Sequence, residues 1–167
     1  MRKLIVLVLL LGIAMPSHAA FKATTVAAEG ALSQIRRQAA ATKQFLVTRR
    51  ALMVAPTVSS TIPLAVIEHL AQVIPALTTL AATPGLLAYA QAQLSDPTYD
   101  IVAEFNAMRT MMISTRDNLI TMFPKDANNF ILYQTINAAG ILTPRTFTAA
   151  QVAPAVALMD TLIATID

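Results

Sequence analysis

Apolar residues recur at helical spacing through the first third of the chain. They are separated by steps of three, four and seven residues, at Ala28, Leu32, Ile35, Ala39, Leu46 and Met53. This period is typical of an amphipathic helix. We expect the helix to begin at Thr24 or Thr25 and to end at about Met53, because Ala55-Pro56 follows. Charged residues repeat every seven positions on another face: Lys22, Glu29, Arg36, Lys43 and Arg50.

Proline and capping residues mark two further helices in the middle of the chain. One begins with a cap at position 59, 60 or 61, has Pro63 in its first turn and presents an apolar stripe of Leu64, Ile67, Leu70, Ala71, Ile74 and Leu77. Pro75 lies inside this pattern, where we expect a kink or a division of the helix. Thr83-Pro84 predicts the start of a short helix that continues through Leu94.

The clearest helical pattern follows Asp96-Pro97 and ends at Phe123-Pro124. Its seam positions alternate steps of four and three, with one polar member: Ile101, Phe105, Met108, Met112, Thr115, Leu119 and Met122. Such a seam predicts near-parallel packing against neighbouring helices. We expect Asp96 to cap this helix, and Asp100 and Glu104 to interact favourably with its dipole.

The pattern changes towards the C-terminus. Residues 130–136 and 141–147 are rich in β-branched and aromatic side chains and flank a turn at 137–140. This arrangement predicts a small β-hairpin, with Pro144 confining the second strand to an edge. Residues 148–151, Thr-Ala-Ala-Gln, form a capping box for a last helix. We expect its apolar face at Val152, Val156, Met159, Ile163 and Ile166.

Together these elements predict a mainly α fold. It is an antiparallel helical bundle of about five helices with a small β-hairpin near 130–147, in a single helical domain over residues 20–167. Residues 1–19 have the layout of a signal peptide: a positive start, an apolar run over 4–15 and small residues before the cleavage site. The run is shorter than the ~20 residues that span a bilayer. We therefore expect an exported protein, periplasmic or extracellular; the alternative is a retained hydrophobic N-terminus.

Composition excludes several classes of protein. Hydrophobic residues make up 56% of the chain and charged residues 13%, against about 25% charged in typical soluble domains, so the chain is not disordered. The absence of cysteine excludes disulfides, thiolate metal sites and a lipoprotein anchor. Removal of Arg2 and Lys3 with the signal segment leaves ten basic against nine acidic residues. We therefore predict no nucleic-acid partner.

Few residues suit catalysis. His69 is the only histidine after the signal segment, and the G-x-S-x-G motif of a nucleophilic serine is missing from the sequence. The four glycines cannot form a phosphate-binding loop, and the Cys and His ligands of zinc or iron sites are missing. We therefore expect no catalytic residue, no cofactor and no metal site, in a protein that is not an enzyme.

Two clusters allow a chemical interpretation beside a structural one. Asp96, Asp100 and Glu104 are four residues apart and could line one face as paired carboxylates, but capping and dipole effects explain them. Thioethers bind Cu(I), which offers a second interpretation for Met108, Met111, Met112 and Met122. Most of these methionines lie on the helical seam, where Met is an ordinary core residue. We prefer the structural interpretation in both cases.

Arg36, Lys43 and Arg50 form the candidate interaction surface. They lie on one side of the first helix, together with further arginines at positions 37 and 49. Phe45 is the only aromatic residue among them, which argues against stacking on single-stranded nucleic acid. A solvated helix face is the simplest interpretation. An acidic protein subunit or an anionic membrane surface is the functional alternative.

Three stretches are similar to small helical proteins of tailed bacteriophages. They are residues 82–108 (ATPGLLAYAQAQLSDPTYDIVAEFNAM), 123–126 (FPKD) and 143–148 (TPRTFT). The resemblance extends from about residue 30 to the end of the chain and carries no catalytic motif. It implies a virion or assembly component.

The sequence thus predicts a non-enzymatic, exported helical protein that acts by protein binding or self-assembly. The alternative is a bacteriophage virion structural protein whose hydrophobic N-terminus is retained. A periplasmic metal-binding protein or an enzyme is the third interpretation, and it rests on His69 or the methionines alone.

Overall fold

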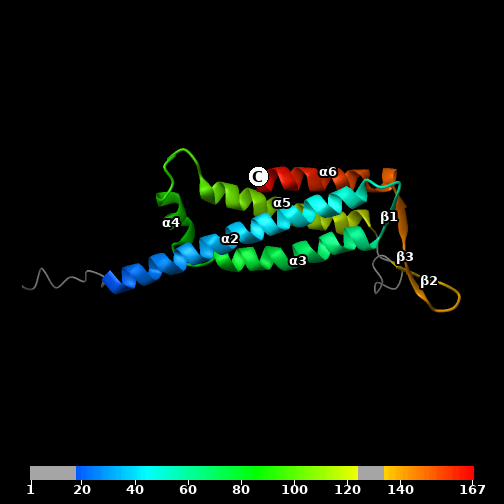
Figure 1. Cartoon of the computed structure of the whole chain (residues 1–167), viewed down its shortest axis with the longest axis horizontal. Coiled ribbons are helices and arrows are strands. Elements are labelled where there is room, and N and C mark those ends of the chain that lie inside the picture. Colours follow the sequence, from blue (N-terminus) through cyan, green and yellow to red (C-terminus); the bar gives the residue numbers. More distant parts are fainter. Residues whose placement is uncertain (1–17, 124–133) are drawn as a thin grey trace, which may run out of the picture.

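The computed structural model describes residues 18–123 and 134–167. Four long helices run alternately up and down (Figure 1): α2 (His18–Met53), α3 (Thr61–Ala81), α5 (Ile101–Met122) and α6 (Ala149–Ile166). A short helix, α4 (Leu86–Ala92), lies in the connection between α3 and α5. Helix α2 packs on α3 and α6, and α5 packs on the same two helices, so α2 and α5 are diagonal in the bundle. The predicted mainly helical bundle of about five helices is confirmed.

The seam predicted for α5 is the buried face of that helix. Phe105, Met108, Met112, Thr115 and Leu119 are all buried. The two outer members of the seam differ, because they lie at the helix ends: Ile101 is half-buried and Met122 is exposed. The Thr115 hydroxyl finds no hydrogen-bond partner among the described residues, an unfavourable arrangement for a buried polar group.

Helix α2 ends at Met53, as predicted, but it begins at His18 rather than at Thr24 or Thr25. Most of the predicted signal segment, residues 1–17, lies outside the described residues. Thr42 is fully buried between the predicted apolar positions of α2. The apolar pattern missed it because its hydroxyl makes it polar, although its side-chain volume suits a core.

Helix α3 has Ser60 at its N-cap position and Pro63 in its first turn, as predicted. Of the kink or division expected at Pro75, the division is wrong, because α3 continues from Thr61 to Ala81. A proline inside a helix removes one backbone hydrogen bond, to the carbonyl four residues earlier. Both Pro75 and that residue, Ala71, are exposed on the outer face of α3, so water can reach the freed carbonyl.

The starts of α4 and α5 differ from the predicted ones. Helix α4 begins at Leu86, after Gly85, whose φ of 75° is in the left-handed region. The N-cap of α5 is Asp100, whose carboxylate accepts hydrogen bonds from the backbone N–H groups two and three residues later. Asp96, the predicted cap, instead accepts from the backbone and hydroxyl of Thr98. A local Asx turn therefore competes successfully with helix capping at Asp96.

The predicted hairpin is confirmed over its described residues. Strands β2 (Gln134–Ile136) and β3 (Leu142–Pro144) are antiparallel, with Ile136 opposite Leu142. Gly140 has a φ of 74° in the connecting turn, a conformation that favours glycine. Residues 130–133 of the predicted first strand lie outside the described residues.

A second two-stranded sheet was not predicted. Strand β1 (Thr57–Ser59) pairs antiparallel with β4 (Thr146–Thr148), so that Val58 is opposite Phe147. Phe147 therefore belongs to this sheet rather than to the hairpin. Its ring lies 4.9 Å from that of the buried Phe123, which joins the sheet to the end of α5.

Helix α6 begins with the predicted capping box at Thr148 and Gln151. Its buried face is Val152, Ala155, Met159 and Leu162, whereas the predicted Val156, Ile163 and Ile166 are only half-buried. The prediction missed Ala155 and Leu162 and so placed the stripe slightly to one side. By length and composition, α3 and α6 could each cross a membrane. This is weak evidence, because a core helix of a soluble protein can have the same length and composition.

Candidate functional site

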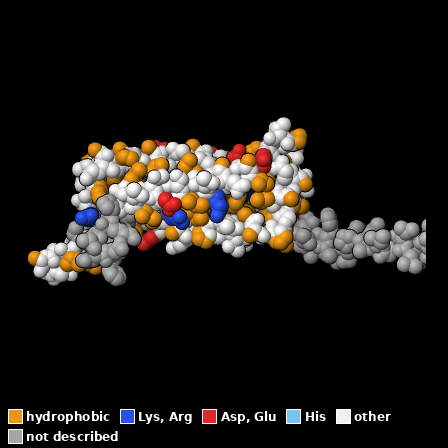
Figure 2. All heavy atoms as spheres, turned by 180° about the vertical axis from the view of Figure 1, so that it is seen from behind, with side chains coloured by type: hydrophobic (Ala, Val, Ile, Leu, Met, Phe, Trp, Pro, Cys, Tyr) orange, Lys and Arg blue, Asp and Glu red, His pale blue; other side chains and the backbone are white. Residues whose placement is uncertain are grey.

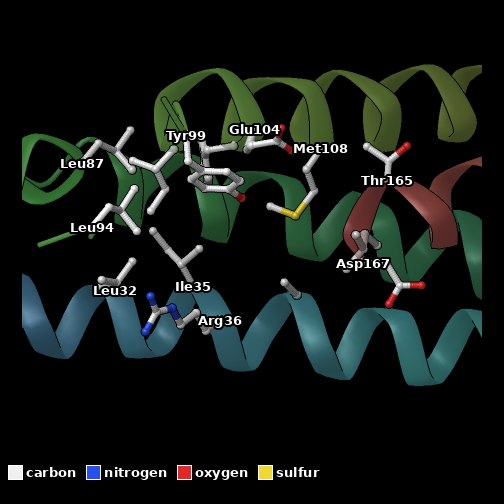
Figure 3. A pocket seen from close by; sticks show the side chains of 14 residues that line it. Leu32, Ile35, Arg36, Leu87, Leu94, Tyr99, Glu104, Met108, Thr165 and Asp167 are labelled. Carbon is white, nitrogen blue, oxygen red and sulfur yellow. The ribbon is translucent and has the colours of Figure 1, made fainter. Parts of the chain in front are cut away.

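A cavity lies at the α4 end of the bundle, because α6 is too short to fill its corner. Helix α6 has 18 residues and its neighbour α5 has 22, a difference of about 6 Å in length. Helix α4 packs on α2 and α5 in this region and replaces the missing turn of α6 only in part. The space that remains has a volume of about 230 Å³ and is bounded by α2, α4, α5 and the end of α6 (Figure 3).

The walls of the cavity are largely apolar. Ile35 of α2 and Phe105 and Met108 of α5 are buried core residues that also line it. Figure 3 shows the Tyr99 ring and the Met108 thioether between α2 and α5. The cavity is open to solvent on one side, so an apolar group that enters from outside could contact these walls.

Two opposite charges stand at the rim, on different helices. Arg36 belongs to α2 and Glu104 to α5, and Figure 3 shows them on facing walls. Within the described part of the chain, neither side chain makes an ion pair or a hydrogen bond. Asp167 also lines the cavity, and its carboxylate is paired with Lys43. The rim therefore carries nearly balanced charge.

The structure divides the predicted interaction surface. Arg50 forms a two-bond fork with Asp160 of α6, with Nε–Oδ1 and Nη2–Oδ2 distances of 2.7 and 3.1 Å. Hydrogen bonding to Arg50 lowers the pKa of the Asp160 carboxyl, and the same bond raises the pKa of Arg50. Lys43 is held by Asp167, so only Arg36 of the three predicted residues lacks an acidic partner within residues 18–123 and 134–167. Two members of the stripe thus fasten α2 to α6.

His69 makes structural contacts between α3 and α2. Its Nε2 is 3.1 Å from the hydroxyl of buried Thr42, and its ring stacks on Phe45 with centroids 4.2 Å apart. Arg49 lies over the Phe45 ring, 5.1 Å from its centroid. Burial lowers the pKa of His69. Within residues 18–123 and 134–167, no three His, Cys, Asp or Glu side chains are grouped so that they could hold a metal ion.

The methionines and acids singled out in the sequence are spread over different environments. Met108 and Met112 are buried in the core, Met111 is half-buried against it and Met122 is exposed. Asp100 caps α5, whereas Glu104 faces the cavity.

The hairpin exposes a cluster of large apolar side chains at the other end of the bundle. Ile136, Ile141 and Leu142, which we call the hairpin tip, are 55, 58 and 50% exposed. The hairpin projects beyond the helices at the end opposite α4 (Figure 1). Residues 134–144 contain no charged side chain. Figure 2 shows hydrophobic atoms on this projection and few charges on the face that it views.

Sequence reasoning found the hairpin but not its exposure, and it missed the cavity entirely. A run such as Ile141-Leu142 is usually the sign of a buried strand. The cavity depends on the relative lengths of helices distant in sequence. No protein-family model, curated protein or solved structure matches the chain.

Proposed function

We propose that this protein is a non-enzymatic helical protein that acts by binding another protein through its hairpin tip. The observation that carries the proposal is the half-exposure of Ile136, Ile141 and Leu142 on a projecting hairpin. Single exposed apolar residues are ordinary, whereas a contiguous group marks interaction sites. A partner with an apolar recess matches this surface, because the hairpin offers no charge to pair with.

The hairpin tip is better suited to docking than the basic stripe. Lys43 and Arg50 are already in ion pairs with α6, so an acidic partner or an anionic membrane would have to compete with Asp167 and Asp160. Arg36 and its neighbour Arg37 remain exposed, and surface ion pairs contribute little.

The setting that we propose is export, on the pattern of residues 1–19, with a virion subunit as the alternative on the bacteriophage resemblance. The intact mass of the protein from its native source separates the two. Loss of 19 residues favours export, and the full-length mass favours a retained N-terminus.

Site-specific photo-crosslinking tests the docking proposal. A photo-reactive phenylalanine analogue is placed at Ile141 and, as a matched control, at Val47, an exposed apolar residue on α2. We expect irradiation in the native source to give one discrete protein adduct from position 141 and none from position 47. The same adducts from both positions, or none from 141, would contradict the proposal.

A further inference from the structure

We propose that the partner is a second copy of this chain, whose cavity receives the hairpin tip, so that copies assemble head to tail. This inference rests on the proposed docking role of the hairpin. It adds which protein the partner is and which surface of that partner the hairpin tip contacts. The chain carries both halves of the contact, an apolar projection and an unfilled apolar cavity.

The two surfaces lie at opposite ends of the bundle. Strands β2 and β3 follow the end of α5, while the cavity adjoins α4, the start of α5 and the end of α6 (Figure 1). A contact between two different surfaces leaves one of each free on the resulting dimer. Repetition therefore adds further copies and gives an open chain of subunits rather than a closed dimer, unless the rotation closes a ring.

Size and polarity favour this occupant. A dry apolar cavity of about 150 Å³ accepts a benzene ring, so the 230 Å³ space has room for an isoleucine or leucine side chain. Leu32 and Leu94 line the space and are only half-buried, so insertion of a side chain would give them further apolar contacts. The uncharged hairpin leaves Arg36 and Glu104 at the rim, in contact with solvent.

The contact is expected to be weak and insensitive to salt. Three side chains bury less surface than the ~1,000 Å² of a stable complex, so association should require high concentration. Because no ion pair is made, added salt should not screen it. An assembly driven by the basic stripe would instead dissociate as the salt concentration rises.

Two complementary variants of the full chain test the contact. The tip variant combines Ile136→Thr, Ile141→Thr and Leu142→Thr, which keeps residues that favour strands. Its control is Val47→Thr with Val54→Thr, two exposed apolar residues of α2.

The cavity variant is Ala39→Leu, which fills the space from the α2 wall. Its control is Ala40→Leu, the next residue, which is exposed. If Ala39→Leu fails to fold, Thr165→Leu at the α6 wall replaces it, with exposed Thr161→Leu as its control.

Sedimentation velocity up to millimolar concentration gives the result. We expect the unmodified protein and the controls to form growing oligomers, and each variant alone to associate at least about tenfold more weakly. A mixture of equal amounts of the tip and cavity variants should form dimers and nothing larger, since only one productive contact remains. Association that survives either variant overturns the proposal.

Monomeric protein at every concentration also overturns it, and the crosslink from Ile141 then shows which claim fails. An adduct with a different protein keeps the docking role and rejects the second copy. Absence of any adduct rejects both.

Discussion

The two ends of the bundle are held together in different ways. At the strand end, backbone hydrogen bonds join segments far apart in sequence: β1 pairs with β4, and the Ser60 N–H donates to the Arg145 carbonyl at 2.7 Å. The rings of Phe123 and Phe147 close the core beneath them. At the α4 end, the buried Leu86 of α4 packs into the core. The polar contacts there are between exposed side chains, such as the Tyr89 hydroxyl donating to Glu29 and the ion pair of Lys43 with Asp167.

The two ends therefore differ in the kind of contact that holds them. Backbone bonds and buried rings hold the base from which the hairpin projects. Polar side-chain contacts at the surface are weak individually, so the α4 end is held mainly by its buried residues, such as Leu86 and Phe105.

The largest difference should come from truncating one apolar residue at each end. Phe123 is 1% exposed, so Phe123→Ala should lower the free energy of unfolding by about 3–5 kcal/mol. Leu94 lines the cavity and is only half-buried, so Leu94→Ala should lower it by about 1 kcal/mol, because contacts there are already incomplete. Urea denaturation measures both values. Equal losses would mean that the two ends are packed equally well.

Removal of a helix cap should cost about the same stability at both ends, because each end has one cap. Asp100 caps α5 at the cavity end and Thr148 caps α6 at the strand end. Replacement of either residue by Ala should cost about 1 kcal/mol. Thermal unfolding of the two variants, with the exposed Thr161→Ala as control, tests this. A much larger loss at Thr148 would show that the sheet and the cap act as one unit.

The features predicted correctly depend on local sequence. The α5 seam from Phe105 to Leu119 and the capping box at Thr148 are periodic or short-range patterns, and the turn at 137–140 has a glycine where φ is positive. The start of α5 was predicted wrongly because two acids precede the helix. Only the competing bonds of Asp96 with Thr98 decide between them.

Features that depend on contacts between distant parts of the chain could not be predicted from the sequence. Strands β1 and β4 have three residues each and lie almost ninety positions apart, too short for a recognisable alternation. The basic stripe was visible in the sequence, but the partners of Lys43 and Arg50 lie at the end of α6 and on α6, more than a hundred residues later. The cavity follows from a mismatch in helix length that no local pattern records.

A smaller, local effect is expected from the ion pair near the cavity. Lys43 contacts Asp167 just beyond the last turn of α6, so Lys43→Gln should loosen that turn and leave the first turn of α6 unchanged. Hydrogen exchange followed by mass spectrometry should show faster exchange near Ile166 and unaltered exchange near Val152. The neighbouring Gln44→Ala, at an exposed position, is the control. Uniformly faster exchange along α6 would show that the two ends are not independent.

The smallest effect should come from His69, which lies where α3 contacts α2, between the two ends of the bundle. Burial lowers its pKa, so the unfolded chain binds a proton more readily than the folded chain. Stability should therefore be complete above the ordinary histidine pKa of about 6.5 and decline as the pH falls through it towards the lower folded value. His69→Gln, which can keep a hydrogen bond to Thr42, should remove this slope. The measurement is the urea midpoint at about pH 5 and about pH 7.5. An equal slope in both proteins would contradict the assignment to His69. Asp160 would not explain such a slope, because Arg50 lowers its pKa and its contribution to stability is lost only in more acidic solution.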